Sequence, residues 1–120
     1  MDVSIIGGGI GGLTLGLMLH KRGIPCRIYE AAPEIKPLGV GINILPHASK
    51  ELCELGLEAA LAKVAITTAD ARYFNRFGQL IYIEPVGRNA GYDWPQFSIH
   101  RGDLHSALLD AFVSAPLYRG

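Results

Sequence analysis

The chain has 120 residues, the length of one domain, and 49% of them are hydrophobic while 18% are charged, which is typical of a folded globular protein. Its 11 basic and 11 acidic residues cancel and form no basic block, so we expect no nucleic-acid partner. Cys26 and Cys53 lack the spacing of a redox or zinc site and the four histidines share no metal-ligand spacing, which predicts free thiols, a reducing cytoplasmic compartment and no metal site. Asp2 and the many glycines that follow argue against a signal peptide or a membrane segment.

The first twenty-two residues carry the most informative pattern in the chain. Residues 3–6 are rich in β-branched side chains and predict a short strand. Gly7, Gly9 and Gly12 follow with the spacing Gly-x-Gly-x-x-Gly, and residues 13–22 predict a helix that is apolar almost all round and therefore buried on a sheet. A glycine triplet between a strand and a helix is the context of the Rossmann dinucleotide-binding fingerprint.

Each glycine of this triplet has a physical task. Gly7 lets the chain turn sharply out of the strand, Gly9 lets backbone N–H groups approach a pyrophosphate, and Gly12 lets helix and strand pack closely. The unpaired N–H groups and the positive end of the helix dipole stabilise an anion at this point. The loop therefore needs no basic side chain, and it contains none.

Glu30 completes the pattern at the end of a second predicted strand, residues 26–30. A carboxylate at this place accepts hydrogen bonds from the ribose hydroxyls of an adenosine and repels a 2′-phosphate. The alternative is an ordinary β-α-β unit with a glycine-rich turn and a surface glutamate. The triplet does not distinguish NAD from FAD, because both present the same ADP half to the loop.

The remaining chain predicts further elements that do not repeat this unit. Prolines and glycines in residues 31–46 indicate an extended loop with a short strand near residues 40–44. In order, we then expect helices over 48–55 and 57–63, antiparallel strands over 66–74 and 80–84 in a second sheet, a strand over 96–100 and a closing helix over 101–113. The order predicts an α/β fold: a Rossmann-like β-α-β unit with an added antiparallel hairpin.

Three blocks in this order resemble the N-terminal part of the single-component FAD-dependent aromatic hydroxylases, which include salicylate and para-hydroxybenzoate hydroxylases. They are GGGIGGLTLGLMLHKRG, PEIKPLGVGINILPHA and QFSIHRGDLHSALLDA. The segments PLGVGIN and SIHRG are most similar to the phenazine-modifying branch of that family.

The resemblance implies FAD, with its pyrophosphate on the loop from Gly7 to Gly12 and its adenosine ribose on Glu30. It further implies that the isoalloxazine ring lies near Val40 and Gly41, and that Arg101 reaches the phosphate or ribityl region. Gly39 and Gly41 lack side chains where a flat ring must pass close to backbone, and a guanidinium offers several donors to phosphate oxygens. The alternatives are a simple glycine-rich loop and a solvated arginine.

The resemblance also implies hydroxylation of a small aromatic or N-heteroaromatic ring, with NAD(P)H as a transient reductant. Two later motifs of the family are missing: Gly102-Asp103 begins the closing helix and does not count as one of them, and His47 stands where the family often has asparagine. No catalytic residue can be assigned. We therefore expect residues 1–120 to form a single partial FAD-binding domain, incomplete relative to the family and inactive alone, with a missing C-terminal part or a homo-oligomer.

Two other interpretations remain. One is a truncated module, without catalysis, that binds an adenine nucleotide weakly or pairs with a partner chain through exposed sheet edges. The other is an NAD-linked Rossmann dehydrogenase, which is less favoured because a regular β-α-β repeat should then follow Glu30.

Overall fold

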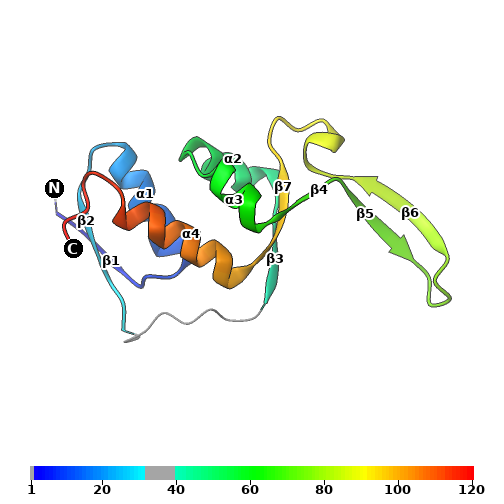
Figure 1. Ribbon diagram of the computed structural model, residues 1–120, viewed down its shortest axis with the longest axis horizontal. Coiled ribbons are helices and arrows are strands. Elements are labelled where there is room, and N and C mark those ends of the chain that lie inside the picture. The colour runs from blue at the N-terminus through cyan, green and yellow to red at the C-terminus, as the bar shows by residue number, and fades with distance from the viewer. Residues whose placement is uncertain (1, 32–39) are drawn as a thin grey trace.

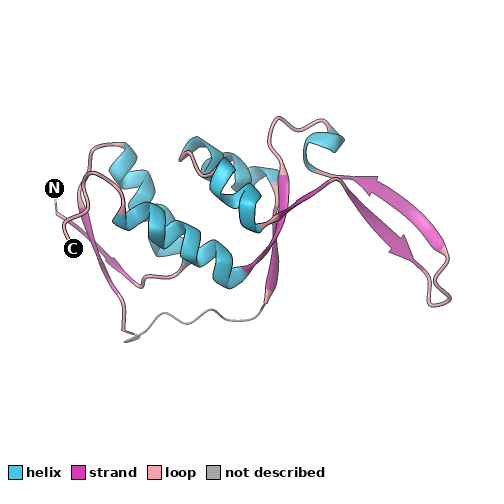
Figure 2. Ribbon diagram, in the orientation of Figure 1, coloured by secondary structure: helices cyan, strands magenta, loops and turns pink. Residues whose placement is uncertain are grey.

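The computed structural model describes residues 2–31 and 40–120, which form an α/β fold (Figures 1 and 2). The elements are β1 (Val3–Ile6), α1 (Ile10–Lys21), β2 (Cys26–Tyr29), β3 (Gly41–Ile44), α2 (Pro46–Glu54), α3 (Glu58–Val64), β4 (Ile66–Thr68), β5 (Asp70–Phe74), β6 (Leu80–Pro85), a 3-10 turn (Gly87–Ala90), β7 (Gln96–His100) and α4 (Arg101–Val113). The predicted fold class is confirmed.

The predicted β-α-β unit is present at the N-terminus. β1 and β2 pair in parallel, from Val3 opposite Cys26 to Ile6 opposite Tyr29, and α1 connects them. The helix begins at Ile10 rather than at the predicted residue 13. Glycine is a poor helix former, so the glycine-rich first turn of α1 cannot be recognised as helical from its sequence.

The helix predicted to be buried on a sheet does pack on β2, but only one side of it is buried. Its buried residues are Leu13, Gly16 and Leu17, whereas Leu15 is 47% exposed. Helix α1 packs on β2 and on α4, and the sheet beneath it has two strands within the described residues. Such a narrow support covers only one stripe of the helix.

A second sheet has the order β3-β7-β4, with both pairs antiparallel. The single strand predicted over residues 66–74 is in fact two strands in different sheets: Ile66 of β4 lies opposite Ser98 of β7, while Asp70 of β5 lies opposite Pro85 of β6. β-branched and aromatic side chains occupy residues 66–68 and 73–74 but not residues 69–72, and this pattern alone does not specify that the partner strand changes at Ala69.

The predicted hairpin is confirmed as β5 and β6, joined by a turn in which the Asn75 side-chain oxygen accepts the N–H groups of Phe77 and Gln79. The hairpin projects from the rest of the molecule (Figure 1). The radius of gyration is accordingly 16.8 Å, compared with about 14 Å for a compact chain of this length. Every residue of β6 is exposed.

Helix α4 organises the core. Leu104, Leu108 and Phe112 are its buried hydrophobic residues, and it packs against α1, α3 and β7. Phe97 of β7 is 1% exposed and belongs to the same hydrophobic cluster. The predicted closing helix is therefore confirmed, and these leucines and Phe112 face the core. No helix among the described residues is long and apolar enough to cross a membrane.

A stacked pair of rings joins α1 to α4. The His20 ring stacks on Phe112 with 4.7 Å between ring centroids, and its Nε2 lies 3.9 Å from Cys26 Sγ. Its Nδ1 is buried and has no hydrogen-bond partner among the described residues. Burial therefore lowers the pKa of His20 from its ordinary value of 6.5, because a charged imidazole loses hydration there.

We predict that replacing Gly12 by alanine destabilises the fold. A Cβ at this position would lie 2.1 Å from the Gly7 carbonyl oxygen, a backbone atom that cannot rotate away. The expected loss in free energy of unfolding is at least about 2 kcal/mol, measured by urea denaturation. Gly11→Ala is the matched control, because its Cβ would meet nothing within 4 Å. Equal stability of the two variants would contradict the close contact.

We also predict that acid destabilises the chain through His20. The unfolded imidazole binds a proton near pH 6.5, whereas the folded one binds it only at lower pH. The contribution to stability is thus fully present above pH 6.5 and is lost as the pH falls towards the folded-state pKa of His20.

Urea denaturation between pH 7 and pH 5 measures this effect. His20→Leu should flatten the pH dependence, while the control His47→Gln, at an exposed position of α2, should leave it unchanged. A His20→Leu variant that keeps the pH dependence of the original chain would show that this ring does not cause it.

Candidate dinucleotide-binding site

The turn after β1 is held by backbone geometry at Gly7. Its φ angle is +107°, a conformation that side chains rarely adopt, and its N–H donates to the Tyr29 carbonyl at 2.7 Å. The turn out of β1 is therefore tied to the end of β2. This is the arrangement that the sequence predicts for the first glycine of the triplet.

The third glycine brings the helix down onto this turn. Position 12 has no room for a Cβ, since the Gly7 oxygen and the Ile5 side chain lie within 2.1 Å and 3.3 Å of where it would stand. The N-terminal turn of α1 thus rests directly on the end of β1. The predicted structural tasks of Gly7 and Gly12 agree with this geometry.

Gly9 is the N-cap of α1, and the space beside it is open. No side chain caps the helix, its first turn has no acidic residue, and a Cβ at Gly9 would meet nothing within 4 Å. The first hydrogen bond within the helix runs from the Leu13 N–H to the Gly9 carbonyl at 3.0 Å. Earlier N–H groups of a helix have no intrahelical acceptor, so this end of α1 is suited to bind an anion.

Glu30 follows β2 directly and contacts the loop. Its Oε2 accepts the N–H of Gly8 at 2.6 Å, and the residue is exposed. The sequence analysis assigns this carboxylate to the ribose of an adenosine and does not predict its bond to Gly8. A carboxylate has about four lone-pair positions, so accepting a backbone N–H is compatible with accepting a ribose hydroxyl as well.

His105 of α4 contacts the same residue, Gly8, and was missed by the sequence analysis. Its Nε2 lies 2.7 Å from the Gly8 carbonyl oxygen. The two residues are 97 positions apart, and a lone histidine on a helix gives no sequence signal for such a contact.

The other predicted site residues meet at the start of α4. The Arg101 N–H donates to the Val40 carbonyl at 2.8 Å, and Gly41 pairs with His100 across β3 and β7. The His100 Nδ1 accepts the N–H of Gly102 at 3.2 Å and so caps the helix. Gly39, which the sequence analysis considered beside Gly41, lies outside the described residues.

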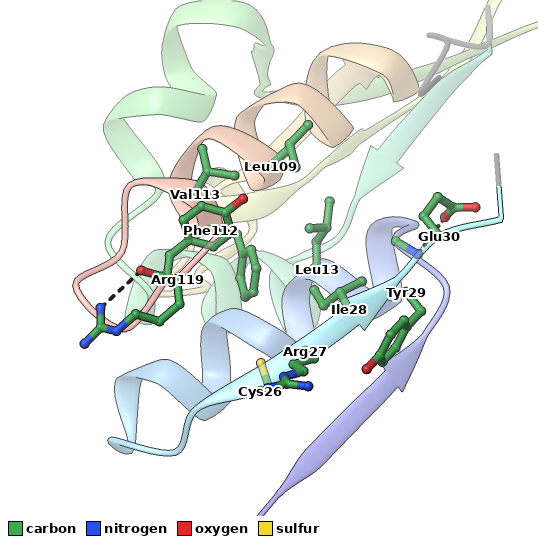
Figure 3. A pocket seen from close by; sticks show the side chains of 13 residues that line it. Leu13, Cys26, Arg27, Ile28, Tyr29, Glu30, Leu109, Phe112, Val113 and Arg119 are labelled. Atoms are coloured by element: carbon green, nitrogen blue, oxygen red, sulfur yellow. Dashed lines mark hydrogen bonds between the residues drawn. The ribbon is translucent and has the colours of Figure 1, made fainter. Parts of the chain in front are cut away.

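A cavity of about 540 Å³ extends from Gly8 and Glu30 along β2 to the second half of α4 (Figure 3). All residues from Cys26 to Glu30 line it. Side chains alternate between the faces of a strand, so a cavity lined by consecutive residues runs along the strand's edge. Of the predicted site residues only Glu30 lines this cavity. The cavity therefore lies along the edge of β2 that has no partner strand among the described residues, and it does not include the whole candidate site.

The described residues form neither a reactive thiol site nor a metal site. Burial raises the pKa of the Cys26 thiol, and burial together with the Glu58 carboxylate raises that of Cys53, so both thiols favour the neutral form. Among the described residues, no three His, Cys, Asp or Glu side chains gather in a way that could hold a metal ion.

Comparison with known proteins supplies the family. Residues 1–105 match the family described as FAD binding domain. The phenazine 1,6-dicarboxylic acid hydroxylase PhzS of Lysobacter antibioticus is 48% identical over 111 residues, covering 92% of this chain and 27% of that protein. The 6-hydroxynicotinate 3-monooxygenase of Pseudomonas fluorescens is 30% identical over 122 residues, covering 98% and 31%. The chain thus spans less than a third of these relatives.

Solved structures show the same fold. The p-nitrophenol 4-monooxygenase PnpA of Pseudomonas putida DLL-E4 superposes with a TM-score of 0.84 at 21% identity, covering 97% of this chain and 31% of that one. CtdE in complex with FAD and a substrate superposes with a TM-score of 0.77 at 19% identity, covering 95% of this chain and 28% of that one. The family match settles the choice between NAD and FAD in favour of FAD. The chain belongs to the FAD-binding domain family, with the resemblance to FAD-dependent aromatic hydroxylases confirmed.

Proposed function

We propose that residues 1–120 form a single partial domain that binds the ADP half of FAD at the loop between β1 and α1. The observation that carries this proposal is the uncapped start of α1 with open space beside Gly9. There the N–H groups of the first helical turn can contact a pyrophosphate, and Glu30, already at the loop, can accept the ribose hydroxyls.

We assign the flavin half to the start of α4. Val40 and Gly41 would lie beside the isoalloxazine ring, and the Arg101 guanidinium would reach the phosphate or ribityl region. The backbone bond from Arg101 to Val40 supports this assignment, because it holds these segments together. When bound, the flavin supplies the redox chemistry. The residues of this chain bind and orient it.

The complete activity that fits this site is hydroxylation of a small aromatic or N-heteroaromatic ring, with NAD(P)H as reductant. Support comes from the relatives, whose names include a phenazine hydroxylase and a hydroxynicotinate monooxygenase. Because the chain covers 27% of the first of these, we propose that turnover needs further polypeptide. Oxidation of NADH or NADPH by this chain alone, with FAD and an aromatic substrate, would contradict that part of the proposal.

The first test is a titration of the chain with FAD and with ADP, followed by flavin fluorescence and by the heat of binding. We expect saturable binding of both, and Gly9→Val should abolish it while the chain stays folded. The reason is that a Cβ at this position would meet nothing in the protein within 4 Å, whereas the valine side chain would occupy the space of the pyrophosphate. Ala60→Val, on an exposed face of α3, is the control. Binding of neither ligand by the original chain would refute the proposal.

Charge reversal at Glu30 is the second test. Glu30→Lys should weaken the binding of both FAD and ADP by at least about tenfold, since hydrogen bonds to a charged group contribute about 1.5–3 kcal/mol. The control is Glu51→Lys, which makes the same charge change at an exposed position of α2. An equal effect of both substitutions would indicate a general electrostatic effect and would remove Glu30 from the site.

A further inference from the structure

His105 contacts the candidate site but has no role in the proposed function. It lies in the second turn of α4 and its half-buried ring contacts the phosphate-binding loop rather than the core. Since a carbonyl oxygen can only accept a hydrogen bond, Nε2 of the ring carries the proton that Gly8 accepts at 2.7 Å. The contact therefore specifies which ring nitrogen carries a proton as well as where the ring lies.

Gly8 is held on both sides of its Cα. Its carbonyl accepts from His105 while its N–H donates to the Glu30 carboxylate at 2.6 Å. The two hydrogen bonds act on the two peptide groups that flank the Gly8 Cα, so together they restrict the φ and ψ angles of Gly8. This matters because the loop is rich in glycine, which has the largest conformational freedom to lose on ordering.

The first turns of α4 connect the loop between β1 and α1 to the part of the candidate site around Val40. Arg101 and His105 are four residues apart, so they lie on one face of α4. The Arg101 N–H in turn is bonded to Val40. One helical turn thus joins the loop between β1 and α1 to the segment after the undescribed residues, although the two are distant in sequence.

We propose that His105 is a positioning residue that fixes the phosphate-binding loop through the Gly8 carbonyl and so couples it to α4. This inference rests on the proposed function. His105 does not contact the ligand itself but holds the loop in the conformation that binds it. Pre-organisation of this kind raises affinity by removing the cost of ordering.

The test compares His105→Leu, which has no donor, with His105→Gln, whose side-chain amide nitrogen can donate from the position of Nε2. Ser106→Ala, at the exposed neighbouring position of α4, is the control. Two readouts are needed: the FAD dissociation constant, and hydrogen exchange of the Gly8 amide in the chain without FAD. If the leucine variant does not fold, His105→Asn replaces it, because its amide is too short to reach Gly8.

We expect His105→Leu to weaken FAD binding by about three- to tenfold, the range of one neutral hydrogen bond, and to speed exchange at Gly8 but not in β7. His105→Gln should restore both values to within about twofold of the original. Unchanged affinity and exchange in His105→Leu, or no recovery in His105→Gln, would overturn the proposal. If no variant binds FAD, the proposed function fails, while the exchange data still decide whether His105 fixes the loop.

Discussion

The backbone contact between position 12 and the Gly7 carbonyl is the constraint on which the candidate site depends. The space there is too small for any side chain, so α1 begins directly against the end of β1. Because the helix begins at that point, its unpaired N–H groups emerge where the turn opens to solvent. A larger residue would separate helix and strand and would misplace the turn that holds these donors. Close packing and anion binding therefore have the same cause.

The N–H groups of this loop fall into two sets, those bonded within the chain and those available for the proposed pyrophosphate. The Gly7 N–H goes to Tyr29 and the Gly8 N–H to Glu30, so the first two donors fasten the loop to the end of β2. The donors that follow belong to the start of α1, where no side chain caps the helix. A carboxylate beside an anion site repels a phosphate. Glu30 nevertheless has a structural role there, because it accepts the N–H of Gly8 and so holds the loop.

Much of this was predictable from sequence, because the informative contacts are local. The strand, glycine triplet and carboxylate of the first unit lie within 30 residues, and β-branched runs and turn residues specify the hairpin of β5 and β6. The remaining features depend on long-range packing. Ile66 pairs with Ser98 rather than continuing the hairpin, and His105 meets Gly8 across 97 residues. No local pattern encodes either choice.

Two parts of the fold lack a partner among the described residues. At one end β1 and β2 make a sheet of only two strands among the described residues, with the cavity along the edge of β2. At the other end the projecting hairpin (Figure 1) exposes Tyr82 and Ile83, which are consecutive in β6 and therefore lie on opposite faces. A two-stranded hairpin with two apolar faces gains little stability in water, so these surfaces suit further protein. The loop instead is fixed by contacts from β2 and α4, both inside this chain. The contacts that fix the proposed ADP-binding loop therefore lie inside this chain, whereas the edge of β2 and the hairpin have no partner strand among the described residues.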